Sequence, residues 1–132
     1  MNATKARLPS PMRLPLFAAP MFLVSGVDLV VGACKAGIVG SFPTSNCRTV
    51  EELDAWMGAI ADALRAPKNA GQKWDNAPWA VNLITHSSNS RLADDLALVA
   101  EYKPPVVITA LGSPKPVIDT VKGYGGIVLA DV

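Results

Sequence analysis

Polar or conformationally special residues follow each of the short apolar runs of this sequence. Asn82 lies within the run Trp79 to Leu83, where an amide side chain costs stability unless it is hydrogen-bonded. Pro20 follows another apolar run, and Thr109 ends a third. If these runs are parallel strands, their carboxyl ends meet at one edge of the sheet, which is where ligands bind. The pattern predicts a small-molecule site at that edge.

His86 is the only histidine and lies in the loop that follows the Asn82 run. The loop is expected to face the same pocket, so contact with a substrate is one interpretation. A solvated loop histidine without a catalytic role is the favoured one, because no carboxylate or nucleophile is spaced to form a relay with it. One histidine and two separated cysteines cannot supply the ligands of a zinc site, so no metal is expected.

The residues that separate the apolar runs contain a second polar cluster, formed by Ser41, Thr44, Ser45 and Asn46. These side chains could cradle an anion, but the same residue types are enriched before helices for capping alone. Trp56 lies at helical spacing, which favours a place in the core over a stacking platform.

Strands and helices are expected to alternate along the whole chain. The expected strands are 16–19, 38–41, 79–83, 106–109 and 127–130, and the expected helices are 27–36, 49–66, 90–102 and 113–123. Ser25 is predicted to cap the first helix, Thr49 and Glu52 form a capping box at the second, and Ser113-Pro114 begins the fourth.

The third predicted helix has one apolar and one charged face. Its spacing predicts that Leu92, Leu96 and Val99 are buried, and that Arg91, Asp94, Asp95 and Glu101 are exposed. The stretch from Lys68 to Ala77 is a polar loop before the third strand.

Alternation of strands and helices without hairpin signals predicts a parallel sheet. Both an open doubly wound sheet and part of a (β/α)8 barrel fit this order. The turn after the first strand, Ala19 to Phe22, lacks the glycines that admit a pyrophosphate, and no Walker phosphate loop is present. The dinucleotide-binding fold is therefore disfavoured.

Composition excludes several classes of protein. The chain has 132 residues, 50% of them hydrophobic, and a formal net charge of +1. Such values disfavour disorder, nucleic-acid binding and a polybasic membrane tether. The apolar run from Leu14 to Val24 is interrupted by Pro15 and Pro20, so it is expected neither to span a membrane nor to act as a leader. Cys34 and Cys47 form no disulfide framework, which favours reduced thiols in the cytoplasm.

Four segments, in this order and spacing, resemble the nitronate monooxygenases, formerly called 2-nitropropane dioxygenases. They are Ala19-Pro20-Met21, Lys35 to Ser41, Val81-Asn82-Leu83 and Thr109 to Pro114. The family consists of FMN-dependent (β/α)8 barrels related to flavin-containing enoyl reductases. The resemblance extends from Leu14 to Val132 and implies oxidation of an alkyl nitronate or a related small substrate.

The resemblance also implies roles for individual residues. The backbone of Ala19, Pro20 and Met21 would pass beneath the isoalloxazine ring, Asn82 would hydrogen-bond its pyrimidine edge, and Thr109 would contact the cofactor. A flavin needs such support because the ring itself carries the redox chemistry. The alternative for Met21 is a methionine that fills a gap in the core.

The same resemblance exposes what this chain lacks. A complete barrel takes about 250 residues, whereas residues 1–132 supply the first five strands of such a domain. The family's catalytic histidine and phosphate-binding turns lie in later strands, so no residue here inherits these roles. A fragment is one expectation; catalytically inactive half-barrels and small-ligand-binding α/β modules are the rivals. Unpaired edge strands also predict either a homo-oligomer that covers them or a rearranged open sheet.

Overall fold

The computed structural model describes residues 9–132, in which five strands alternate with four α-helices. The strands are β1 (Phe17–Ala18), β2 (Val39–Pro43), β3 (Trp79–Ile84), β4 (Val106–Ala110) and β5 (Ile127–Ala130). The helices are α1 (Val27–Lys35), α2 (Val50–Arg65), α3 (Leu92–Tyr102) and α4 (Lys115–Gly123), and a short 3-10 helix, η1 (Thr44–Asn46), follows β2. Every predicted element is present, and only its ends differ. None of the helices in this part of the chain is long and apolar enough to cross a bilayer.

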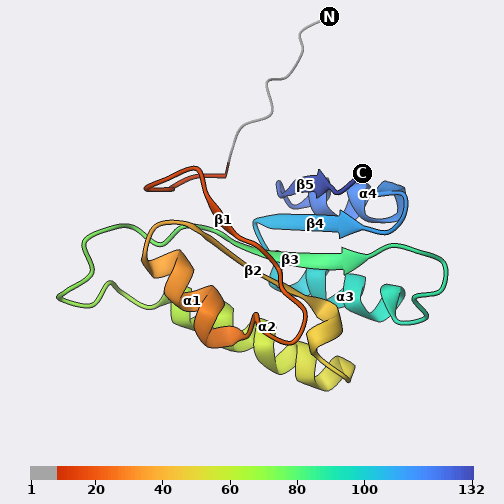
Figure 1. Ribbon diagram of the computed structural model, residues 1–132, viewed down its shortest axis with the longest axis horizontal. Helices are drawn as coiled ribbons and strands as arrows, with labels where there is room; N and C mark the ends of the chain where they lie inside the picture. Colours follow the sequence, from red (N-terminus) through yellow and green to blue (C-terminus); the bar gives the residue numbers. More distant parts are fainter. Residues whose placement is uncertain (1–8) are drawn as a thin grey trace, which may run out of the picture.

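The sheet is entirely parallel and its order is β1-β2-β3-β4-β5. When every crossover steps in the same direction with the same hand, all helices fall on one face. Figure 1 shows α1, α2 and α3 together on one side of the sheet, and α4 contributes to the same core. A doubly wound sheet would reverse direction and carry helices on both faces. The observed arrangement is that of a barrel wall.

The main core lies between the sheet and the helices. Its fully buried members include Val30 of α1, Leu53, Met57 and Ile60 of α2, and Phe42 of β2. Trp56 packs against Phe42 with the ring centroids 5.7 Å apart, which confirms its place in the core.

The opposite face of the sheet is here called the inner face. Val39, Ala80 and Val106 are buried on it, with Met12, Phe17, Ile108 and Ile127 packed around them. The inner face of a closed barrel is filled in the same way.

The capping prediction holds for α2 and is wrong for α1. The backbone N–H of Glu52 donates to Thr49 Oγ1 at 3.1 Å, and the Glu52 carboxylate accepts from the backbone N–H of Arg48 at 2.7 Å. Gly26, not Ser25, is the N-cap of α1, without a side-chain cap. The Ser25 hydroxyl instead accepts from the backbone N–H of Met21 at 2.9 Å and closes the preceding turn.

The start of α3 also corrects the sequence prediction. The helix begins at Leu92 instead of Ser90, and Asp95, expected on the exposed face, is only 1% exposed. Its carboxylate accepts from Arg91 Nε at 2.7 Å, so a charge that was expected in solvent lies in the core with its partner. In α4, Pro114 holds the N-cap position in place of Ser113, although Ser113 Oγ accepts from the backbone N–H of Lys115 at 3.3 Å.

Candidate functional site

Strand register fixes which side chains share the inner face near the carboxyl edge of the sheet. Pro43, Asn82, Ile108 and Leu129 pair with one another across β2 to β5 and form one row. Asn82 and Ile108 are half-buried, whereas Leu129 is exposed. Asn82 is the one member of this row with hydrogen-bonding capacity in its side chain.

The Asn82 amide is only partly used by the fold. Its Nδ2 donates to the Ile108 carbonyl of the neighbouring strand at 3.0 Å. Within residues 9–132, no group donates to its Oδ1, and no buried side-chain nitrogen or oxygen in this range lacks a partner. The Oδ1 atom is therefore accessible, and it can accept a hydrogen bond from a ligand on the inner face.

The segment Ala19-Pro20-Met21 follows β1 at the same edge. Ser25 Oγ donates to the Ala19 carbonyl at 3.4 Å, which closes a turn from Ala19 to Ser25. The Met21 side chain is 42% exposed, so the alternative in which it fills the core is wrong. Adjacent strands lie about 4.8 Å apart, which puts β1 and β3 about 10 Å from each other, within the span of a three-ring heterocycle.

Thr109 occupies the other face of the sheet from Asn82. It pairs with Leu83, a member of the helix-side core, whereas its neighbour Ile108 pairs with Asn82. Side chains alternate between faces along a strand, so the Thr109 side chain points toward the helices. It is fully buried, and its hydroxyl donates to the Leu129 carbonyl at 3.4 Å. The sequence prediction placed Thr109 with Asn82, and the register separates them.

His86 lies apart from the inner face, in the exposed loop after β3. Both hydrogen-bonding contacts of its ring are to Ser88: His86 Nδ1 lies 2.8 Å from the Ser88 hydroxyl and 3.2 Å from the Ser88 backbone nitrogen. The cavity that His86 lines measures about 560 Å³ and includes Leu92 and Leu96 of α3 and Pro116 of α4. It contains neither Asn82 nor the Ala19-Pro20-Met21 turn. This placement agrees with the interpretation of a solvated loop histidine.

Two members of the polar cluster, Ser41 and Asn46, hydrogen-bond the backbone of β1 and of the segment after it. Asn46 Nδ2 donates to the carbonyls of Met21 and Ser25, at 3.1 Å and 2.8 Å, and Ser41 Oγ donates to the Ala18 carbonyl. The sequence suggested two roles for Asn46, as part of an anion cradle or as a capping residue. Its actual partners lie more than twenty residues away, and no local pattern indicates them.

Arg91 and Asp95 form an ion pair that the sequence did not predict. It lies beside η1, the short helix that contains Asn46. Arg91 pairs with Asp95 across one turn of helix, and it also donates to the carbonyls of Cys47 and Thr44 at 2.7 Å and 2.8 Å. One guanidinium thus joins the start of α3 to both ends of η1. The signal that could have found the pair is the position of Asp95, which lies on the same helical stripe as Leu92 and Val99.

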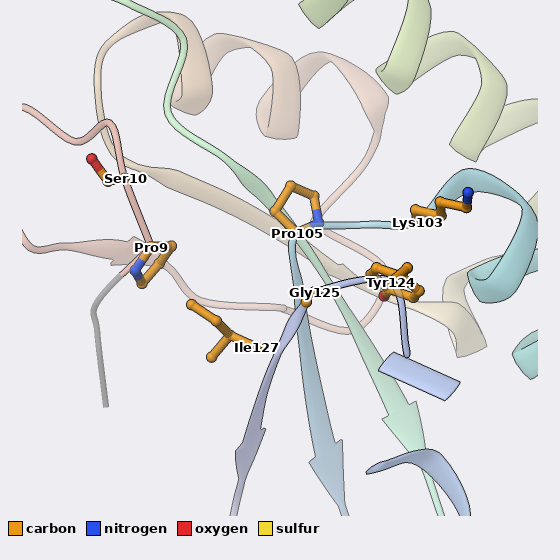
Figure 2. A pocket seen from close by; sticks show the side chains of 8 residues that line it. Pro9, Ser10, Lys103, Pro105, Tyr124, Gly125 and Ile127 are labelled. Carbon is orange, nitrogen blue, oxygen red and sulfur yellow. The ribbon is translucent and has the colours of Figure 1, made fainter. Parts of the chain in front are cut away.

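Another hollow lies at the amino edge of the sheet and measures about 330 Å³ (Figure 2). Pro9, Lys103, Tyr124 and Ile127 are among the residues around it. The Tyr124 hydroxyl donates to the Pro104 carbonyl at 2.9 Å, and burial raises the Tyr124 pKa. In folds of this class the amino edge serves stability and the carboxyl edge binds ligands, so we assign no site here.

Both cysteines are free and buried. Burial raises the pKa of Cys34 from 9.0 to about 11 and that of Cys47 from 9.0 to about 12. Because the thiolate is the reactive form, neither thiol is poised as a nucleophile. In the described range, no three histidine, cysteine or carboxylate side chains cluster as metal ligands.

We predict that both thiols resist alkylation at pH 8 until the protein unfolds. A pKa raised by two units lowers the thiolate fraction about 100-fold. Iodoacetamide labelling followed by mass spectrometry, with and without urea, measures this protection. The same pKa shifts make the free energy of unfolding depend on pH. The contribution of the two thiols to that free energy is complete below pH 9. It declines as the pH rises toward 11, because the thiols of the unfolded chain ionise at lower pH than those of the folded protein. Rapid labelling of the native protein at pH 8 would contradict the burial of Cys34 and Cys47.

Comparison with known proteins supports the architecture. No protein-family model matches the chain, and no curated protein matches it. Among solved structures, the chain is similar to FabK from Thermotoga maritima, with a TM-score of 0.72 and 24% sequence identity over 92% of this chain. A single-site variant of the same FabK gives the same TM-score, identity and coverage of this chain.

The chain spans about a third of the FabK chains it matches, 34% and 36% of their lengths. FabK is a TIM barrel, so the five parallel strands and their helices correspond to part of a barrel wall. At this identity the likeness establishes the fold. The expected fold class, the first five strands of a (β/α)8 barrel, is confirmed.

Proposed function

We propose that this chain is the flavin-binding amino-terminal part of an FMN-dependent oxidoreductase of the nitronate monooxygenase type. The observation that carries the proposal is the accessible Oδ1 of Asn82 on the inner face, next to the carboxyl edge where the Ala19-Pro20-Met21 turn lies. Similarity to FabK and the resemblance of four sequence segments to the nitronate monooxygenases support it. The proposed substrate is an alkyl nitronate or a related small molecule.

The residues present fit the ring of such a cofactor. The pyrimidine edge of a flavin carries an N–H donor, and Asn82 Oδ1 is an acceptor without a protein partner in the described range. Pro43 and Ile108 flank Asn82 in its row; Ile108 is half-buried and supplies apolar surface, whereas Pro43 is buried. When bound, FMN would supply the redox chemistry, while the chain binds and orients the ring.

The chain's own residues also determine how water reaches the site. Met21, Phe22, Leu23 and Val24 follow Pro20 and are all exposed and apolar. Covering a reactive ring with such side chains removes water, which strengthens the remaining polar contacts. We therefore assign the turn an excluding role and Asn82 an orienting role.

We predict that Asn82→Leu weakens FMN binding about fivefold to tenfold, the equivalent of one lost hydrogen bond. Titration of the purified protein with FMN, followed by quenching of flavin fluorescence, measures the affinity. Thr109→Val is the matched control, because the Thr109 side chain points to the other face of the sheet. It is expected to leave FMN affinity unchanged.

The wild-type protein provides the decisive test. We expect the protein, incubated with FMN and passed through gel filtration, to be yellow and to release the colour on denaturation. Colourless protein would overturn the flavin proposal. If the same chromatography then shows a dimer, the inactive half-barrel that pairs through its sheet edges becomes the better account.

A further inference from the structure

The turn from Met21 to Val24 is ordered without support from the hydrophobic core. The exposed fractions of Phe22, Leu23 and Val24 are 64%, 77% and 64%. Apolar side chains that face solvent gain nothing from burial, and a loop with so few packing contacts is normally among the least stable parts of a protein. Hydrogen bonds must therefore hold its conformation.

The backbone conformation of Leu23 strengthens the need for hydrogen bonds in this turn. Its φ of 61° lies in the left-handed region, which disfavours any residue with a Cβ atom. A bulky side chain persists there only when the surrounding structure determines the conformation. The backbone N–H of Leu23 donates to Asn46 Oδ1 at 2.8 Å, and this hydrogen bond offsets part of the conformational energy of the positive φ.

Asn46 makes two further bonds to the same turn. Its Nδ2 donates to the Met21 and Ser25 carbonyls, so one amide satisfies three backbone groups of the turn. Asn46 is itself fixed, because Arg91 holds the carbonyls of Thr44 and Cys47 on either side of it. The turn after β1 is thereby connected through η1 to α3.

We infer that Asn46 is a positioning residue, whose amide holds the Met21 to Val24 turn in the conformation that receives the cofactor. The inference rests on the proposed function and adds to it a residue that does not touch the ring. A loop that already has its bound conformation loses little conformational entropy when the ligand binds. Ordering the loop in advance therefore increases the affinity for the ligand. Removing the amide should loosen the turn and weaken binding while leaving the sheet intact.

Two substitutions separate the contributions of Asn46. Asn46→Ala removes all three bonds. Asn46→Asp keeps an acceptor for the Leu23 N–H but turns a carboxylate oxygen toward the carbonyls of Met21 and Ser25, where a donor is needed. The matched control is Asn76→Asp, because Asn76 Nδ2 likewise donates to one carbonyl, that of Leu64, at 2.8 Å in the loop before β3. The control repeats the chemical change without touching the turn.

The first measurement is amide hydrogen exchange of Leu23 and Ser25 in the protein without FMN. Asn46→Ala is expected to exchange at least tenfold faster at both amides, whereas Asn46→Asp, which keeps the acceptor for the Leu23 N–H, is expected to do so at Ser25; β3 and β4 stay protected as in wild type in both variants. Asn76→Asp is expected to leave both amides unchanged. Unchanged exchange in Asn46→Ala would overturn the inference, whatever FMN does.

The second measurement is FMN titration of the same four proteins. We expect the Asn46 variants to bind FMN about tenfold more weakly and Asn76→Asp to bind as wild type does. Faster exchange with unchanged FMN affinity would overturn the positioning role. A wild-type protein that binds no FMN would overturn the proposed function and with it the cofactor-positioning role, while the exchange data would still show separately whether Asn46 orders the turn.

Discussion

Arg91→Met is expected to lower the free energy of unfolding by about 3–5 kcal/mol. The substitution leaves the Asp95 carboxylate, which is 1% exposed, without its cation in the core. It also removes the donors to the Thr44 and Cys47 carbonyls. Urea denaturation followed by circular dichroism measures the change, and an unaltered m-value would show that the loss lies in the native state.

The surface pair of Arg65 and Asp62 is the control for this prediction. Their atoms approach to 2.9 Å, against 2.7 Å for Arg91 and Asp95, but the side chains are 76% and 77% exposed. Asp62→Asn should therefore change the free energy of unfolding by no more than about 0.5 kcal/mol. A double variant, Arg91→Met with Asp95→Leu, should recover part of the loss, because no charge then remains buried. Equal losses for the two pairs would mean that Asp95 lies in solvent.

The course of α2 and the parallel pairing of the strands follow from local patterns in the sequence. The capping box and the spacing of Leu53, Met57 and Ile60 are contained within one turn or two, so the sequence alone predicts the helix. The alternation of elements without hairpins likewise predicts a parallel sheet. These features depend on neighbours in the chain, and no tertiary contact overrides them.

The face occupied by Thr109 could not be predicted in this way. Apart from Thr109 itself, β4 is apolar, as strands covered on both faces are, so its sequence carries no alternation that would separate inner from helix-facing positions. The register with β3 determines the face on which Thr109 lies, because it pairs Thr109 with the helix-facing Leu83. A shift by one residue would have reversed the assignment.

Asp95 and Asn46 were missed for related reasons. The sequence predicts Asp95 on the exposed face of α3, as its charge suggests, although it lies three residues after Leu92 and four before Val99. Its pairing with Arg91 one turn earlier accompanies its burial. Asn46 is a good capping residue by type, but its bonds reach Met21, Leu23 and Ser25 across a different loop. Signals for such contacts are not local, so they become visible only once β1 and β2 are paired.

Gly40→Ala is expected to destabilise the protein by about 3 kcal/mol, because α1 packs directly on the backbone of β2. A Cβ atom at Gly40 would lie 2.3 Å from the Val30 carbonyl oxygen and 2.8 Å from the Val30 Cα. Backbone atoms cannot rotate away as a flexible side chain would, so the whole helix must shift. Since α1 begins at Val27, shortly after the Met21 to Val24 turn, this shift should also weaken FMN binding.

Gly32→Ala tests this reasoning with the same chemical change on the same helix. Apart from the neighbouring backbone of α1 itself, no atom lies within 4 Å of the place a Cβ would take at Gly32, which is an exposed position within α1. Alanine there should stabilise the protein by about 0.5–1 kcal/mol, because it restricts the unfolded chain and favours the helix. Thermal and urea unfolding of both variants would thus show shifts of opposite sign. Two shifts of the same sign would mean that helix propensity, rather than contact between α1 and β2, governs the Gly40 site.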